Sequence, residues 1–227
     1  MTEVPDSPQR HSPQHRGAPP ETARALDRYG GPARLLALSD GVFAIAMTLL
    51  VLDITVPPGL DPAAFRDALR DLPPKLGAYA LSFAIIAAFW RDHNRHLRHL
   101  RAVDGVLMHV TLLGLGLIAL LPFPTTLLSE YGGRPQSVAF YAAAVAAMDG
   151  TQIALLVVRL RRPWLNAVPL DPRAVRADIA DAAATAVVFT ASIPLTYAIG
   201  PQAIWSWVLL LPLKFFTGRR QRAAGTG

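Results

Sequence analysis

Apolar and polar positions alternate along this chain on the scale of whole helices. Long apolar segments separated by short polar stretches lie roughly at Leu35–Val56, Leu76–Leu97, Val103–Leu127, Val138–Leu160, Ile179–Ile199 and Ala203–Phe216. Most reach the roughly 20 residues that a helix rising about 1.5 Å per residue needs to cross about 30 Å of hydrocarbon. The sixth segment is the shortest. The pattern predicts an all-α integral membrane protein with six transmembrane helices.

The composition supports this fold class over a soluble one. Of the residues, 52% are hydrophobic and 17% are charged, whereas about a quarter of a soluble domain is charged. Most of the apolar segments also lack the polar face that a helix of a soluble bundle presents to water. The chain has no cysteine, which excludes disulfides, thiolate chemistry and iron–sulfur clusters. A soluble enzyme is the less favoured interpretation.

The two ends of the chain differ from the apolar middle. Residues 1–30 hold five prolines, several Arg and His and no apolar run, so they cannot bury enough surface to offset the entropy of ordering. They also lack the apolar core of a signal peptide. We expect a disordered cytosolic tail over 1–30, a six-helix transmembrane domain over 31–217 and a basic cytosolic tail over 218–227.

The positive charges predict the orientation in the membrane. With the N-terminus inside, 18 of the 22 Lys and Arg residues lie in the tails and inner loops, and the outer loops hold only Arg66, Arg70, Lys75 and Arg134. Cytoplasmic loops of membrane proteins carry such an excess. We predict two cytosolic termini in a multi-pass protein of the plasma membrane. Topology and anionic lipid then account for the net charge of +6 without a nucleic-acid partner.

The first helix carries the richest pattern. At 100° per residue, Ile45, Leu49 and Leu52 fall within about 60° of one another, and Thr48 borders their stripe. Asp40 points about 140° away from Ile45. One interpretation is that the stripe lines something while Asp40 anchors the helix to its neighbours. The other is that these aliphatic residues are ordinary lipid or packing contacts.

Charged and polar groups gather where the first two helices enter the membrane. Arg34, Ser39 and Asp40 open the first helix, and such groups are costly there unless they are paired. We expect Arg34 and Asp40 to be paired, near Trp90 and His93 at the end of the second helix. His93, with His96 and His99, has the i, i+3, i+6 spacing of a metal site, but the helix spreads the three rings over about 120°. We predict no metal and a solvated basic turn for His96 and His99.

Isolated polar groups accompany the later helices. These are His109, Asp149, Asp178 and Asp181, of which the last two are expected to be charges at the start of the fifth helix. Pro122 and Pro124 are expected to break the third helix near the outer surface. No nucleotide-binding, zinc-protease or hydrolase motif occurs, and no carbonyl selectivity filter. We predict neither enzymatic activity nor a cofactor.

Three strings together resemble the bacterial branch of the transmembrane protein 175 family of potassium channels. They are RLLALSDGVFAIAMTLLVLDI from residue 34, FWRDH and LLPFPTTLL, so the resemblance covers about residues 34–128. The family signature is an Arg, three residues and then Phe-Ser-Asp. Arg34, Ser39 and Asp40 match that signature, while Leu38 replaces the Phe. In the second helix, Trp90 and His93 match a WxxH arrangement.

The resemblance implies a homotetramer whose four first helices surround a potassium-conducting pore. In such channels rings of large aliphatic side chains narrow the pore, and the corresponding positions here are Ile45, Leu49 and Leu52. Thr48 corresponds to a pore threonine associated with potassium preference. The resemblance also implies a structural polar network on the cytosolic side, composed of Arg34, Ser39, Asp40, Trp90 and His93.

Two other functions remain open from the residues alone. A proton-coupled carrier would use Asp149, His109 or Asp178. Inverted repeats and broken helices would favour it, but no clear repeat is seen. A membrane scaffold without conductance is the third hypothesis. We predict a potassium-permeable, leak-type channel with a hydrophobic constriction in the first helix.

Overall fold

The computed structural model describes residues 31–200, 202, 203 and 207. The predicted tails over 1–30 and 218–227, and most of the sixth segment, lie outside the described residues. The elements are α2 (Pro32–Leu49), η1 (Leu50–Asp53), α3 (Pro62–Arg70), α4 (Leu72–Leu97), α5 (Gly105–Leu120), α6 (Pro122–Tyr131), α7 (Pro135–Arg161), η2 (Pro163–Leu165) and α8 (Pro172–Ile199).

Five spans in the described part of the chain are long and apolar enough to cross a membrane. They are Pro32–Asp53, Pro62–Leu97, Gly105–Tyr131, Pro135–Arg161 and Pro172–Ile199. The first five predicted segments each fall largely within one of these spans, so the all-helical membrane architecture is confirmed for them. The chain is a multi-pass membrane protein.

Proline and aspartate mark where the helices begin. The ring of Pro fixes a helical φ and lacks an N–H, so it suits the first turn, and α2, α3, α6, α7 and α8 each start on a proline. Asp61, Asp104 and Asp171 then cap α3, α5 and α8 by accepting backbone N–H groups of the first turn. The predicted break in the third span occurs as expected, because α5 ends at Leu120 and α6 begins at Pro122.

The fifth span begins earlier than the sequence pattern predicted. Asp171 and Pro172 start α8 seven residues before Ile179, because the cap and the proline fix a helix start that hydropathy does not detect. Asp178 and Asp181 therefore lie inside the helix and are not charges at its start, which corrects the prediction. The short helix α3 was not predicted either.

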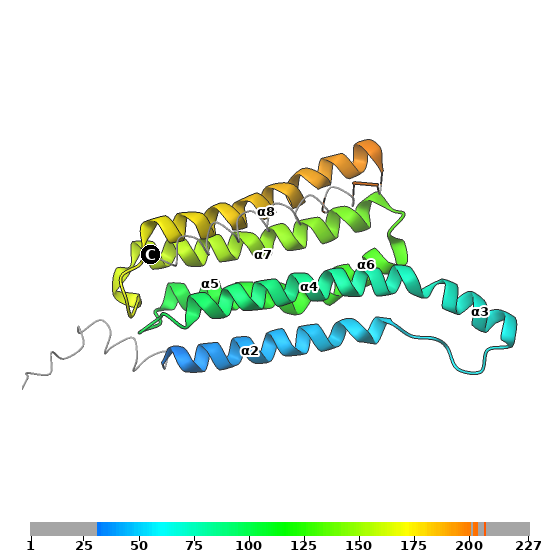
Figure 1. Ribbon diagram of the computed structural model, residues 1–227, viewed down its shortest axis with the longest axis horizontal. Helices are drawn as coiled ribbons and strands as arrows, with labels where there is room; N and C mark the ends of the chain where they lie inside the picture. The colour runs from blue at the N-terminus through cyan, green and yellow to red at the C-terminus, as the bar shows by residue number, and fades with distance from the viewer. Residues whose placement is uncertain (1–30, 201, 204–206, 208–227) are drawn as a thin grey trace, which may run out of the picture.

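The helices form three layers. α2 lies on one side, α4, α5 and α6 lie in the middle, and α7 and α8 lie on the other side (Figure 1). α2 contacts α4 and α5, while α5 and α6 pack on α7, which pairs with α8 along its length. A buried cluster joins the layers and includes Phe43, Ile86, Leu115, Tyr141 and Phe189.

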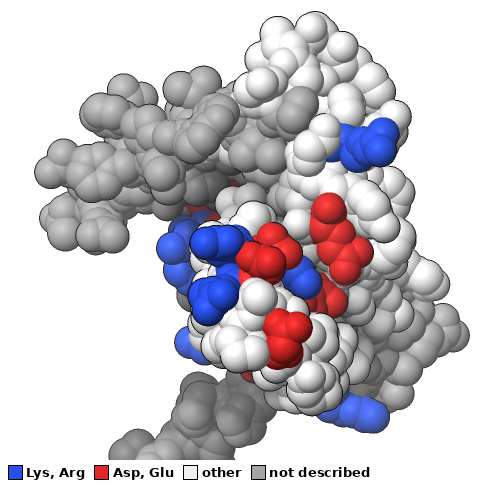
Figure 2. Space-filling model, turned by 90° about the vertical axis from the view of Figure 1, so that its right-hand side faces the viewer, with Lys and Arg blue, Asp and Glu red and all other residues white. Residues whose placement is uncertain are grey.

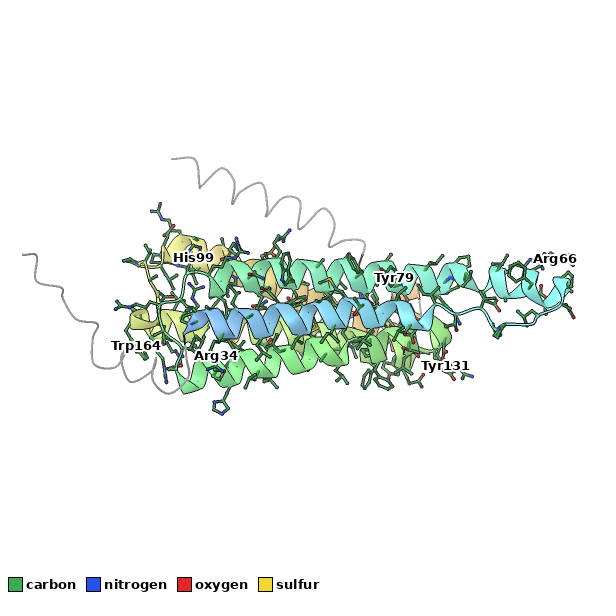
Figure 3. All side chains as sticks on the ribbon, turned by 90° about the horizontal axis from the view of Figure 1, so that it is seen from below. Arg34, Arg66, Tyr79, His99, Tyr131 and Trp164 are labelled. Atoms are coloured by element: carbon green, nitrogen blue, oxygen red, sulfur yellow. The ribbon has the colours of Figure 1, made fainter. Side chains whose placement is uncertain are left out.

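α3 projects beyond the bundle in continuation of α4 (Figure 1). Figure 2 looks at this end of the molecule and shows charged side chains of both signs gathered over it. Asp67 and Arg70 form one exposed ion pair there, at 3.0 Å. At the opposite end lie the start of α2 and the loops that follow α4 and α7, where Arg34, His99 and Trp164 are seen together (Figure 3).

Candidate functional site

The two faces of α2 have different surroundings in the subunit. One face is buried against α4 and α5 through Leu35, Ser39, Phe43 and Ala46. Leu50 continues this face into η1 and is also buried. This buried face attaches α2 to α4 and α5 of the same subunit.

The opposite face of α2 is apolar and open. Ile45 is 61% exposed, Leu49 40% and Leu52 64%, and Leu38, about two turns before Ile45, is 48% exposed. Thr48 is exposed beside them. The structure thus leaves uncovered the three aliphatic side chains that the sequence pattern placed on one stripe and the threonine that borders them. Leu52 lies in the 3₁₀ turn η1 and not in α2.

Thr48 presents hydroxyl oxygen lone pairs on this face. Its Oγ1 donates a hydrogen bond of 2.8 Å to the carbonyl oxygen of Ile45, three residues earlier. Because the single hydroxyl proton is used in that bond, the oxygen can act toward a further group only as an acceptor. This is the behaviour required of a cation ligand.

Asp40 joins α2 to α4 at the end of the bundle where α2 starts. Its Oδ1 accepts hydrogen bonds from Trp90 Nε1 at 2.8 Å and from Asn94 Nδ2 at 2.6 Å. The amide oxygen of Asn94 in turn accepts from Arg98 Nε at 3.2 Å. Hydrogen bonds to a carboxylate are shorter and stronger than those between neutral groups, so Asp40 is a strong attachment between the two helices.

Ser39 makes a second attachment one residue earlier. Its hydroxyl donates to the carbonyl oxygen of Leu35 at 2.8 Å, and its Oγ lies 3.1 Å from Nε2 of His93. Since the hydroxyl proton is already used, Nε2 of His93 must be the donor in this contact. The ring of His93 also lies against Phe43, with 5.5 Å between the ring centroids. We call Ser39, Asp40, Trp90, His93 and Asn94 the inner anchor.

Arg34 does not join the inner anchor. Its side chain is exposed, and among the described residues it forms no ion pair. The expected pair with Asp40 is absent because six residues at 100° each place the two side chains about 120° apart around the helix. Arg34 also lies at the end of the bundle (Figure 3), where a guanidinium does not need a carboxylate partner.

Asn94 is the member of the inner anchor that sequence reasoning missed. It follows Trp90 by four residues, which places the two side chains on the same face of α4. Because Trp90 is predicted to lie near Asp40, the spacing of four residues indicates that Asn94 lies near Asp40 as well.

A second set of polar contacts lies toward the other end of α2. The hydroxyl of Thr126 in α6 donates to Oδ2 of Asp53 at the end of η1. Nearby in the core, Ser82 contacts Thr125 at 2.8 Å and Tyr141 at 2.9 Å, which joins α4, α6 and α7. α2 and η1 are therefore tied to the rest of the subunit at both ends of the open stripe.

The remaining polar candidates are distributed over other surfaces. His96 is buried and its Nδ1 lies 4.0 Å from Oδ2 of Asp178, so the prediction of a solvated His96 is wrong. The reason is that the ring is turned toward Asp178 of α8 and not toward solvent. His99 is exposed, as predicted. His109 is exposed on α5 and contacts the backbone of its own helix. Within the described residues no group of three His, Cys, Asp or Glu side chains is placed to hold a metal ion.

Residues 34–122 match the model of a protein family that is described as the endosomal/lysosomal potassium channel TMEM175. A protein from Streptomyces collinus named as a potassium channel is 41% identical over 122 residues, which are 54% of this chain and 59% of that protein. The human protein named endosomal/lysosomal proton channel TMEM175 is 31% identical over 111 residues, which are 45% of this chain and 22% of that protein. The named relatives are channels rather than enzymes.

The similarity to solved structures extends over most of the chain, as one crystal structure illustrates. It is the crystal structure of a lysosomal potassium-selective channel TMEM175 homologue from Chamaesiphon minutus, with a TM-score of 0.66 and 27% identity. The similarity covers 84% of this chain and 97% of that one.

Proposed function

We propose that this chain, which belongs to the TMEM175 family, is a potassium-permeable, leak-type cation channel of the plasma membrane. Four copies of the subunit surround one pore, with both termini cytosolic. The proposal extends to this chain the channel activity named for its relatives. It is supported by the open apolar stripe of α2, the observation on which it chiefly rests.

The stripe supplies the constriction of the pore. In a fourfold assembly with the open face of α2 turned to the axis, Ile45, Leu49 and Leu52 each contribute one aliphatic ring. Such rings restrict conduction by excluding water from a narrow segment. Cations cross passively, either partly dehydrated or when the rings widen.

Thr48 is the polar element of this lining. Four hydroxyl oxygens, each already donating to the backbone at 2.8 Å, offer four acceptors to a partly dehydrated cation. A hydroxyl oxygen replaces a water ligand without adding a negative charge, so it can assist dehydration without trapping the ion. We assign the potassium preference to this ring.

The inner anchor positions the pore helix but does not bind the ion. It holds α2 on α4 through Asp40 and Ser39, on the side of the helix turned away from the stripe. Rotating α2 about its axis would remove the aliphatic rings from the pore, and the carboxylate contacts of Asp40 oppose that rotation. The contact between Asp53 and Thr126 opposes it at the other end.

A proton-coupled carrier is the second candidate, and one observation favours it. Asp149 and Asp178, two of the residues considered for it, line the same cavity between α4, α7 and α8. His109, the third, lies apart from that cavity on the exposed side of α5.

The decisive experiment measures assembly and flux on one preparation. We expect light scattering to give the mass of a tetramer in detergent. In liposomes we expect potassium flux that needs no proton gradient and gives unitary currents. Flux that saturates and requires a proton gradient would establish the carrier, and a monomer that conducts would exclude a pore shared by four copies of α2.

A further inference from the structure

The second membrane span is longer than a membrane requires. Pro62–Leu97 contains 36 residues, whereas about 20 helical residues cross the hydrocarbon. Trp90 and Arg91 mark one boundary of the hydrocarbon, because tryptophan and arginine side chains gather at the interface. About 20 residues earlier the chain has reached Asp71. α3 therefore lies outside the hydrocarbon, at the end of the span opposite the inner anchor.

Large apolar side chains are exposed in this part of the molecule. Phe65 is 46% exposed and Leu69 is 43% exposed, and Leu76 near the start of α4 is 48% exposed. α3 projects beyond the bundle (Figure 1), and among the described elements its main contact is α4, its own continuation. Because neither lipid tails nor another described helix covers Phe65 and Leu69, these side chains face water in the isolated subunit.

The exposed apolar side chains belong to one continuous seam. Phe65, Leu69, Leu72 and Leu76 follow one another at spacings of four, three and four residues, and Leu72 is half-buried. Asp71, between α3 and α4, keeps right-handed helical dihedral angles (φ −84°, ψ −7°), so the helical period continues across it. Alternating spacings of three and four are those of helices that pack side by side on one another. We call these four apolar residues the outer seam.

The charges beside the outer seam suit a second, parallel copy of the same helix. With Phe65 at position d of a heptad, Asp61 is at g and Arg66 at e, the positions that form ion pairs between parallel helices. Asp61 uses only Oδ1 to cap α3, and within the described residues neither Asp61 nor Arg66 forms an ion pair. Asp67 and Arg70, which pair with each other at 3.0 Å, are at f and b, away from the seam. The charges that remain are complementary between copies.

The position of α3 in the fold favours contact between copies. α3 leaves the line of α4 toward the side of the bundle on which α2 lies (Figure 1). α2 carries the proposed pore face, so α3 lies toward the fourfold axis of the proposed channel. Copies related by a rotation axis along the membrane normal are parallel to one another, which is the orientation that a contact between Asp61 and Arg66 requires.

We propose that the outer seam is a contact surface between subunits, at which α3 of one copy packs on α3 of a second copy of this chain. The proposal rests on the fourfold channel proposed above and adds a helical vestibule at the mouth of the pore opposite the inner anchor. Apolar surface that is buried in water favours association through the hydrophobic effect. Helices surrounded by lipid lack this driving force, so the outer seam stabilises the assembly in a way that the membrane spans do not.

The test is disulfide cross-linking of the full-length protein in liposomes. The chain has no cysteine, so one introduced thiol reports on one position. Leu69→Cys places a thiol in the outer seam, and oxidation with copper phenanthroline should link subunits into dimers that a reducing agent separates. Asp67→Cys, exposed on the other side of α3, is the control. It should cross-link at least about tenfold more slowly, because a disulfide requires Cα atoms within about 7 Å.

A charge reversal tests the ion pair between copies. In the Leu69→Cys background, Arg66→Glu faces Asp61 of the neighbouring copy with a like charge and should slow cross-linking several-fold at low ionic strength. Added salt should reduce this effect, because it screens exposed charges. Arg70→Glu makes the same change on the side away from the seam and should slow cross-linking less. Equal effects of the two reversals would exclude the contact between Asp61 and Arg66.

The mass of the assembly and its potassium flux, measured on the same preparation, distinguish failure of this proposal from failure of the channel. A conducting tetramer in which Leu69→Cys cross-links no faster than Asp67→Cys would overturn the outer seam and leave the channel intact. A protein that forms no tetramer and conducts no potassium would overturn both. Dimers formed rapidly by Leu69→Cys and slowly by Asp67→Cys, in a tetramer that conducts, are the expected result.

Discussion

The buried and open faces of α2 are almost equally apolar, yet the subunit treats them in opposite ways. Phe43 and Leu50 are each 1% exposed, whereas Ile45 and Leu52, two residues further along the chain in each case, are 61% and 64% exposed. The buried face packs on α4 and α5. The open face contacts no other helix of the described subunit to a comparable extent.

The difference shows that hydrophobicity alone does not identify the core in a membrane protein. In a soluble monomer an open aliphatic stripe of this length would be costly, but in a membrane other subunits or lipid can surround an apolar face that the subunit itself leaves open. What separates the two faces is polar contact, since Ser39 and Asp40 hydrogen-bond to α4 and turn one side of α2 inward. Substitutions on either face test whether the two faces differ in this way.

The largest expected effect is on the buried face. Phe43→Ala leaves a cavity between α2, α4 and α5 and should cost about 3–5 kcal/mol of stability. Thermal unfolding in detergent should show a much lower melting temperature or a loss of folded protein. Ile45→Ala, two residues away on the open face, is the control and should leave the fold of the subunit intact. Equal damage by both would mean that the two faces do not differ.

The next effect concerns the inner anchor. Asp40→Ala removes the acceptor shared by Trp90 and Asn94, and each hydrogen bond to a charged group contributes about 1.5–3 kcal/mol. We expect loss of the assembled species on size exclusion, with near-normal flux per correctly assembled tetramer. Asp67→Ala, at an exposed acidic residue of α3, should change neither. A stable tetramer with altered ion selectivity would place Asp40 in the permeation path.

On the open face, Ile45→Asn should wet the constriction. If Ile45 forms the narrowest ring of the proposed pore, an amide in its place lowers the barrier to water and ions, so potassium conductance should rise several-fold and selectivity should weaken. Val187→Asn places the same amide on an exposed valine of α8 and should not change flux. Unchanged flux and selectivity in assembled Ile45→Asn would remove Ile45 from the pore.

The smallest effect is expected at Thr48. Thr48→Val keeps the shape of the side chain and removes its oxygen, so the preference for potassium should fall by a few-fold while assembly is preserved. The measurement is the reversal potential in mixed potassium and sodium. Thr48→Ser retains the hydroxyl and should behave like the wild type. If the reversal potential of Thr48→Val does not move, Thr48 does not contribute to selectivity.

Much of the fold could be predicted from the sequence because a membrane helix satisfies its own backbone hydrogen bonds. The first five spans and the break at Pro122 were predicted from local patterns for this reason. The start of α8 was missed because its first turns are polar, and hydropathy detects only the apolar part of a helix. The short α3 was missed because its alternating charges resemble those of a loop.

The sequence by itself determined which segments span the membrane and which side chains share the stripe of α2, because both follow from local composition and from 100° per residue. Only the tertiary structure decided which contacts form between helices. It pairs Asp40 with Asn94 and leaves Arg34 outside, and it buries His96 beside Asp178 of α8. These outcomes depend on how helices distant in the chain are rotated and packed, and helical periodicity carries no information about the neighbour that a given face will meet.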